Sequence, residues 1–370
     1  MPMINRLRYL CIMIGGFLGP FAGQSLAVVL PEFAADFGIS LHLASLTMTA
    51  YLLPFAIMML FSTYLVRQRS PSHVVRVAYA VIAVASVALV FSPVWWVFLV
   101  AYVLAALSNA FTAPLLQLVL RHITPDNQLG KALGTYAAMQ SFGMFSAPLV
   151  AGATVSVGSW RWMYVLLLVF AVLIVGVGLP YVPPPGSARG PRVLSWRALR
   201  GCLTLLSIGV GVIGLSFLVA LHVGTLFDAP PLTRGFIVMF GGLSAFLLAR
   251  PVGALADRFG LRPVVVVSLL VAAVGVCGVA LSPWMAAIAV LWGVAVLAAQ
   301  GVQVGVNMLV LSTPGGGQML STIQSFRFFG SALTPIVILP LYTASPLLAF
   351  GAAAVVLCAA AALNITELRR

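Results

Sequence analysis

Apolar runs of about twenty residues recur along the whole chain, and they constrain the fold more than any other feature. We count twelve in the 370 residues, each about long enough to cross a hydrocarbon core of ~30 Å as a helix. The runs span approximately residues 9–30, 41–65, 74–92, 95–119, 131–155, 162–182, 201–224, 233–251, 264–282, 284–311, 317–340 and 345–364. Short turns with proline, glycine or charge separate them, such as RQRSPSH and STPGGGQ. The sequence therefore predicts an all-α membrane protein with twelve transmembrane helices.

Composition leads to the same class. Hydrophobic residues make up 62% of the chain and charged residues 7%, against about 25% charged residues in a soluble protein. A water-soluble core could not hide that much apolar surface, so the surrounding solvent must be lipid. The first run is too long for the apolar part of a signal peptide and lacks a convincing cleavage site, so we treat it as a span.

The distribution of basic residues predicts the orientation. With the N-terminus inside, sixteen of the nineteen Lys and Arg residues fall in inner segments, two (Arg161 and Arg234) fall outside, and Arg327 lies within a span. Inner loops of membrane proteins carry such an excess, so both termini are expected to be cytoplasmic. The net charge of +13 then matches anionic lipid headgroups rather than nucleic acid. One lysine among eighteen arginines is typical of a GC-rich bacterial genome, hence of a bacterial inner membrane.

The chain also repeats itself at an offset of about 190 residues. GMFSAP at 143–148 corresponds to GSALTP at 330–335, and Gln117 corresponds to Asn307. This repeat predicts two pseudo-symmetric six-helix bundles, residues 1–182 and 201–370, with a site between them. A cytoplasmic linker, residues 183–200, would join the bundles.

Two motifs resemble those of a known family. The segment GALADRFGLRP between the eighth and ninth runs resembles the cytoplasmic loop signature of the major facilitator superfamily, in which the matching residues are Asp257, Arg258, Gly260 and Arg262. The fifth run is similar to the antiporter motif of the drug:proton exporter branch at Gly134, Gly143, Ala147, Pro148, Ala151 and Gly152. The resemblance implies the fold of that superfamily, a loop that latches one conformational state, and export of drug-like solutes.

Each motif also has a simpler physical explanation. Small residues four apart let helices approach closely, and Pro148 bends its helix, so ordinary packing would account for the fifth run. Asp257 stands where a carboxylate can cap a helix, Gly260 permits a tight turn, and both could belong to a solvated turn. The chain departs from the family patterns at three positions: Arg67 lies near the Asp expected in the first-half copy of the loop signature, Tyr102 stands where exporters typically have an arginine, and Ala22 stands where some branches have an aspartate. These departures put proton coupling by the usual residues in doubt.

Arg327 is the most conspicuous charge in the sequence. It lies about nine residues into the eleventh run, roughly 14 Å deep and close to the membrane midplane. An arginine there costs about 2.5–3.5 kcal/mol to insert, so it should face a cavity or a partner. It could bind an anionic group of the substrate or act as a fixed charge during exchange; alternatively, it donates to helix-end carbonyls or to Gln324 and Asn307.

Six amide side chains within the spans are further candidates for substrate binding: Gln24, Asn109, Gln140, Gln300, Gln303 and Asn307. In lipid they must face protein or water, which favours a polar cavity. Gln300, Gln303 and Asn307 share one helix face, while any one amide alone could simply join two helices.

All six carboxylates lie outside the predicted spans. The nearest candidates for proton coupling are His222 in the seventh run and Glu32 at the outer end of the first, although a lone histidine is often only a packing residue. Without an embedded carboxylate, the expected cargo is anionic, zwitterionic or neutral.

Other classes of function find little support. No P-loop, HExxH or GxSxG motif is present, and the four cysteines lie in separate runs without metal-binding or disulfide spacing. We therefore expect no enzymatic activity, cofactor or metal, and a monomer that binds a small-molecule substrate. Export by alternating access, coupled to protons, is the leading hypothesis. A facilitator or importer of an organic anion is the first alternative, and a non-transporting membrane partner protein is the second.

Overall fold

A computed structural model describes residues 3–184, 196–248, 251, 258–311 and 316–365. These residues are helical almost throughout, as the apolar runs predict. The helices before residue 184 are α1 (Met3–Gln24), α2 (Leu30–Phe37), α3 (Leu41–Leu65), α4 (Pro71–Phe91), α5 (Trp95–Ile123), α6 (Asp126–Ser156) and α7 (Trp162–Val177). Those after residue 196 are α8 (Trp196–Gly211), the 3₁₀ turn η1 (Ile213–Leu215), α9 (Ser216–Phe227), α10 (Pro231–Leu247), α12 (Leu261–Leu281), α13 (Met285–Leu311), α14 (Gly316–Ala344) and α15 (Pro346–Ile365).

Every predicted span coincides with a helix or a pair of helices, and α3 has the predicted bounds. Within the described residues, eight spans are long and apolar enough to cross a membrane by length and composition, and α7 and α10 are shorter apolar helices. Helix ends follow local chemistry. The Ser40 hydroxyl accepts from the Leu43 amide at the start of α3, and Gly38, with a φ of 62°, ends α2. Gly260 precedes α12 with a φ of 87°, as the tight turn expected there requires.

Two spans differ from the prediction. The first was expected to continue to residue 30, but α1 ends at Gln24 and a turn leads into α2, which has Pro31 in its first turn. The seventh was expected to be one helix and is instead α8, η1 and α9. A Cβ added at Gly214 in η1 would lie 2.7 Å from the Cβ of Thr334. The backbone of this span therefore passes very close to α14 where the helix is interrupted.

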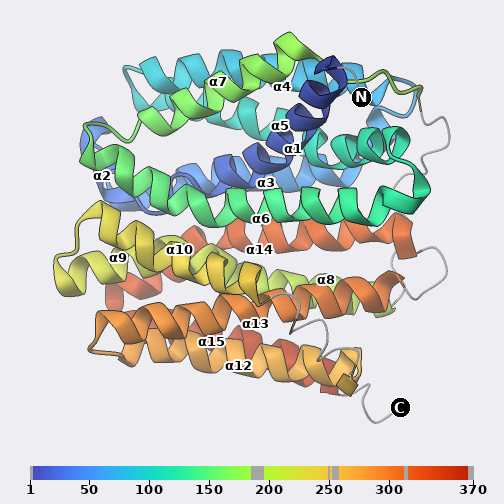
Figure 1. The fold of residues 1–370 in the computed structure, drawn as a ribbon. Helices are drawn as coiled ribbons and strands as arrows, with labels where there is room; N and C mark the ends of the chain where they lie inside the picture. Colours follow the sequence, from blue (N-terminus) through green and yellow to red (C-terminus); the bar gives the residue numbers. More distant parts are fainter. Residues whose placement is uncertain (1–2, 185–195, 249–250, 252–257, 312–315, 366–370) are drawn as a thin grey trace.

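The helices form two groups, shown in Figure 1 as an upper group in blue to green (α1–α7) and a lower group in yellow to red (α8–α15). The groups meet where α6 packs along α10 and α3 packs along α14. Both chain termini lie at one end of the molecule, here called the terminal end; α2 and the turn before α10 lie at the opposite, distal end. The division into domains at residues 182 and 201 stays a prediction.

Corresponding glycines in the two groups make similar close contacts. A Cβ added at Gly143 of α6 would lie 3.0 Å from the carbonyl carbon of Phe17 in α1. A Cβ added at Gly330 of α14 would lie 2.8 Å from the amide nitrogen of Val210 in α8. Both glycines thus permit backbone contact between the first and fifth helical spans of their group. This likeness agrees with the internal repeat at 143–148 and 330–335.

Candidate functional site

Arg327 on α14 is a buried cation, with 8% of its surface exposed. Its Nη1 donates to Oε1 of Gln303 on α13, and Nε2 of Gln303 lies 3.4 Å from Oε1 of Gln324, one turn before Arg327. The guanidinium Nε is buried without a hydrogen-bond partner. Among the described residues no carboxylate pairs with this arginine, since the two ion pairs found there involve other residues. The charge is therefore oriented by amides but not neutralised, which would attract an anionic group in a low-dielectric interior.

An aromatic pair lies beside this charge. The ring of Phe328 lies 4.7 Å from the guanidinium carbon of Arg327, close enough for a cation–π contact. Phe328 in turn meets Phe55 of α3 edge to face at 4.9 Å, so this contact joins the two helix groups. One turn away, the Thr49 hydroxyl donates to the Ala332 carbonyl at 2.7 Å. Arg327 thus lies next to the surface along which α3 and α14 meet.

The other predicted amides lie in different surroundings. Gln300 and Asn307 are half-buried on α13 with Gln303, and the Asn307 side-chain oxygen has no hydrogen-bond partner among the described residues. Gln140 is half-buried on α6. Gln24, at the end of α1, accepts from the Ser216 hydroxyl of α9 at 3.2 Å, which is a contact between the groups. Of these amides, Gln303 is the one that forms a hydrogen bond with Arg327 within the described part of the chain.

Asn109 is bonded entirely within the first group. Its amide nitrogen donates to the Tyr51 hydroxyl at 2.9 Å and to the Gly19 carbonyl at 3.2 Å, while its oxygen accepts from the Thr112 hydroxyl at 2.8 Å. These bonds tie α1, α3 and α5 together. With its hydrogen-bonding capacity largely used, Asn109 is better placed to hold the group together than to bind a solute.

Two positions where the chain departs from the family patterns, Tyr102 and Ala22, touch each other. The Tyr102 hydroxyl on α5 donates to the Ala22 carbonyl on α1 at 3.2 Å, and both residues are buried. A neutral hydrogen bond therefore links these two positions. Neither Tyr102 nor Ala22 carries a charge. Among the described residues midway along the helices, the buried charge is therefore Arg327.

The two candidates for proton coupling lie near the distal end. His222 is buried on α9, with Nδ1 3.3 Å from the Tyr342 hydroxyl and Nε2 without a partner. Glu32 on α2 forms an ion pair with Arg234 on α10. The histidine therefore lies inside the second group, whereas the carboxylate bridges both groups.

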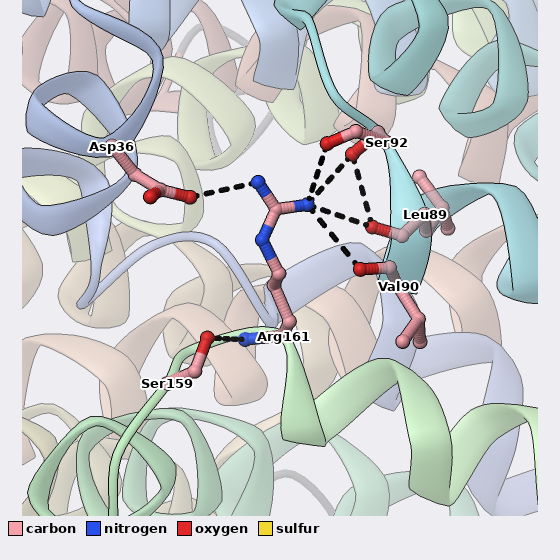
Figure 2. A network of polar contacts seen from close by, with 6 residues as sticks. All are labelled: Asp36, Leu89, Val90, Ser92, Ser159 and Arg161. Atoms are coloured by element: carbon pink, nitrogen blue, oxygen red, sulfur yellow. Dashed lines mark hydrogen bonds and ion pairs between the residues drawn. The ribbon is translucent and has the colours of Figure 1, made fainter.

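A second ion pair at the distal end stays within the first group (Figure 2). Arg161, just before α7, bonds Asp36 at 2.8 Å through Nη2 and the Ser92 hydroxyl at 2.8 Å through Nη1. Nη1 also points at the carbonyls of Leu89 and Val90, which end α4 without helical partners. This network fixes α2, α4 and the start of α7 to one another.

The glycines of the fifth-run motif have three different environments. A Cβ added at Gly134 would meet nothing within 4 Å, whereas Gly143 contacts α1 within the first group. A Cβ at Gly152 would lie 2.9 Å from the carbonyl carbon of Pro231 in α10, across the boundary between the groups. Gly235 of α10 makes the reciprocal contact, because a Cβ added there would lie 2.5 Å from the Pro148 carbonyl oxygen. Of these three glycines, Gly152 is therefore the one that lies at the contact between the groups.

The loop signature is only partly described. Asp257 lies outside the described residues, Arg258 is exposed with its guanidinium 5.3 Å from the Phe259 ring, and Arg262 is half-buried. Gly260 provides the turn before α12. The part of the signature within the described range is therefore a turn at the terminal end. No group of His, Cys, Asp or Glu that could hold a metal ion occurs among the described residues.

Sequence reasoning missed Phe55, Phe328 and the pairing of Arg234. Phe328 follows Arg327 directly, but one phenylalanine among many gives no signal until α3 is seen against α14. The sequence predicts Arg234 as an outer charge at the start of the eighth run and gives no partner for it. The sequence offered one hint of this ion pair: an arginine and a glutamate from opposite halves are both expected on the outer side.

Comparison with known proteins assigns a family to most of the chain. A family profile described as Major Facilitator Superfamily matches residues 12–335. The riboflavin transporter RibZ of Clostridioides difficile is 25% identical over 187 residues, which is 47% of this chain and 38% of RibZ. The lincomycin resistance protein LmrB of Listeria monocytogenes is 21% identical over 181 residues, 49% of this chain and 38% of LmrB. The chain thus matches well under half the length of these curated relatives.

Solved structures extend the similarity to the full chain. The D-xylose-proton symporter has a TM-score of 0.79 at 14% identity and covers 97% of both chains. The human organic anion transporter MFSD10 has a TM-score of 0.70 at 16% identity, covering 98% of this chain and 100% of that one. At these identities the likeness concerns the fold.

Proposed function

The chain belongs to the Major Facilitator Superfamily and has its helical membrane fold, and from this premise we propose that it exports a small amphipathic solute by alternating access. The solute carries an anionic or acceptor-rich group that Arg327 binds, with Gln303 holding the guanidinium in place. Gln300 and Asn307 on the same helix face are proposed to offer further polar contacts. We place the protein in a bacterial inner membrane with both termini cytoplasmic, so that the distal end is the outer end.

The observation that carries this proposal is the buried, unneutralised charge of Arg327. Among the described residues the guanidinium donates to Gln303, and its Nε and the Asn307 side-chain oxygen are buried without a hydrogen-bond partner, so both are polar atoms that a bound ligand would satisfy. A buried cation without a counter-ion is costly, and an anionic ligand would relieve that cost. The relatives named for riboflavin transport and lincomycin resistance are consistent with a drug-like solute.

Contacts between the groups support an alternating-access cycle. Gly152 and Gly235 bring α6 and α10 to backbone contact at the distal end. Nearer the middle, the Phe145 ring meets the Phe246 ring at 5.6 Å, and Phe55 meets Phe328. We propose that this is the state closed toward the outside. Release of solute then requires these same contacts to separate.

A second candidate function is facilitated diffusion or uptake of an organic anion without proton coupling. It is favoured by the absence of any carboxylate paired with Arg327 among the described residues. A carrier that moves protons usually needs an embedded group that changes its charge as the site changes sides. The two candidates therefore differ in proton movement and agree on the role of Arg327.

Reconstituted vesicles with an imposed pH gradient and a pH-sensitive dye would test both. Lipophilic cations, neutral drugs and organic anions are added in turn to vesicles with wild-type protein, Arg327→Ala, or Gln303→Glu. The glutamate variant places a carboxylate beside the guanidinium and neutralises it with little change of shape. Arg69→Gln, which removes an exposed arginine in the turn after α3, is the matched control.

An anionic substrate should lose about 10- to 150-fold in affinity in both site variants, the equivalent of one charge-assisted bond of about 1.5–3 kcal/mol. The control should behave as wild type. Collapse of the gradient by substrate identifies proton-coupled export, whereas solute movement without proton movement identifies the facilitator. Equal affinities in wild type and Gln303→Glu would contradict the assignment of Arg327 to substrate binding.

A further inference from the structure

A cavity of about 540 Å³ lies at the terminal end of the first group, where the start of α4, the end of α5 and residues 182–184 meet. Its volume is in the range of sites that hold small molecules. The described residues that line it all belong to the first group, and none of them contacts Arg327. The cavity is therefore separate from the site around Arg327, and the proposed transport cycle gives it no role.

One wall of the cavity carries a positive charge. Arg121 and His122, in the last turn of α5, line the cavity and are exposed. Neither side chain forms a hydrogen bond or an ion pair with the part of the chain that the structure describes, and no acidic residue is among the described lining residues. Basic residues in a last turn also interact with the helix dipole, but that interaction alone needs no cavity. The guanidinium therefore keeps its donors available for an anion.

The N-terminus of α4 adds positive potential to the same cavity. Pro71, the first residue of this helix, is a lining residue, and the helix has no side-chain cap. The Ser70 hydroxyl stands at the cap position but donates to the Val182 carbonyl at 2.7 Å instead of accepting from the helix. The first amide groups of α4 are thus left without a side-chain acceptor, and such helix ends attract phosphate groups.

Another wall of the cavity is apolar and is fixed in position. It consists of residues 182–184, two of which are prolines, together with Leu118 of α5. The bond from Ser70 and a second bond, from the Ser72 hydroxyl to the Pro180 carbonyl, fasten this segment to the start of α4. Proline also restricts the backbone, so little further ordering is needed when a ligand binds. A ligand that suits both walls has an anionic group and an apolar part.

The cavity lies at the level of the inner headgroups in the proposed orientation. Helix α4 has 21 residues and is about 31 Å long, close to a hydrocarbon core of about 30 Å, so Pro71 stands at the inner boundary of that core. Helix α5 has 29 residues and is about 43 Å long, so its last turns, with Arg121 and His122, extend past the boundary. Headgroup phosphates lie at this depth, and basic pockets between helices on the cytoplasmic side suit anionic headgroups.

We propose that this cavity binds the phosphate group of an anionic phospholipid from the inner leaflet. Arg121 and His122 donate to the phosphate oxygens, and the start of α4 adds its dipole. The glycerol and the first carbons of the acyl chains lie against Leu118 and residues 182–184. A free phosphate ion shares the anionic chemistry but would leave the apolar wall uncovered. The site goes beyond the proposed transport function and depends only on the proposed orientation.

Native mass spectrometry of the full chain in detergent tests this assignment. The delipidated protein is titrated with dioleoylphosphatidylglycerol and, separately, with dioleoylphosphatidylcholine, which has the same chains and no net charge. Arg121→Gln combined with His122→Gln removes the guanidinium and the imidazole, whereas Leu118→Glu keeps both and adds an acidic group to the cavity. Arg258→Gln is the matched control, because it removes an exposed arginine at the terminal end of the second group. Inorganic phosphate is added as a competitor to distinguish a lipid headgroup from a free anion.

Wild type and Arg258→Gln should bind the first phosphatidylglycerol at least about fivefold more tightly than phosphatidylcholine, as expected for one charge near the membrane surface. Both cavity variants should lose this preference, and inorganic phosphate should not displace the lipid. An unchanged preference in the folded cavity variants overturns the proposal, and so does an equal loss in Arg258→Gln or displacement by inorganic phosphate. Thermal midpoints identify the folded variants, and if one cavity variant does not fold, the other decides. No substrate is added, so this result is independent of the transport assay.

Discussion

Replacing Gly152 by alanine should prevent the distal end from closing as it does in this structure. The new methyl group would lie 2.9 Å from the carbonyl carbon of Pro231 and 3.0 Å from the Cα of Leu232, both in the backbone of α10. The Pro231 carbonyl oxygen would lie closer still, and ordinary contact begins at 3.4 Å, so α6 and α10 have to move apart by more than about half an ångström. None of these three atoms belongs to a flexible side chain that could turn away. The strain therefore acts on the closed state and disappears when the groups separate.

The size of the effect follows from similar changes in packed interiors. Inserting a methyl group into a well-fitted contact costs about 1–3 kcal/mol. Because only the closed state has this contact, the ratio of closed to open molecules should fall roughly 5- to 150-fold. The helix itself should not suffer, since alanine is favoured over glycine by about 1 kcal/mol within a helix. The thermal midpoint of the variant should therefore stay near that of wild type.

Two measurements test this prediction. Spin labels on cysteines that replace Val157, after α6, and Leu281, at the end of α12, report the distance between the groups at the distal end, and vesicles report transport. Gly134→Ala is the matched control, because it adds the same methyl group to the same helix where nothing lies within 4 Å. Gly152→Ala should show mostly long distal distances and slow transport, and Gly134→Ala should match wild type. If the two variants have the same distance distribution, the crossing of α6 and α10 does not hold the distal end closed.

Three further changes separate stability from transport. Tyr102→Phe removes the hydroxyl that donates to Ala22 and should lower the free energy of unfolding by about 1 kcal/mol, seen as a lower thermal midpoint with transport retained. Phe55→Leu removes the ring contact between the groups beside Arg327 and should raise the half-saturating substrate concentration roughly 2- to 10-fold in vesicle transport. Gly330→Ala clashes with α8 inside the second group and should cost about 1–3 kcal/mol of stability; an unchanged midpoint would contradict this.

The helices were predictable because the membrane imposes their length and composition. The run at 41–65 and helix α3 have the same bounds, since Ser40 and the preceding glycine mark the start chemically. The interruption at Ile213–Leu215 was not predicted, and it lies where Gly214 is in close contact with Thr334, which is far away in the sequence. Local patterns identify where a helix is favourable, and they do not reveal which residue of another helix occupies the space beside it.

The candidate site was predictable in part for the same reason. A lone arginine near the middle of an apolar run is visible in the sequence, and helical periodicity places Gln303 on a face with Gln300 and Asn307. That the arginine bonds Gln303 and lies against Phe328 depends on the packing of α13 and α14. The environment of Glu32 could not be found from its own helix, because its partner Arg234 is contributed by the other group.

The interrupted seventh span has a mechanical consequence. In a continuous helix, bending breaks a ladder of hydrogen bonds, but between α8 and α9 that ladder is already replaced by a 3₁₀ turn. Bending at Ile213–Leu215 therefore breaks fewer helical hydrogen bonds than bending a continuous helix would, while α8 stays packed against α14 through Gly209 and Gly330 on the terminal side of this turn. The part of the span on the distal side of the turn includes Gly224, against which Arg234 packs. A change of angle between α8 and α9 would therefore also move the Arg234 side chain.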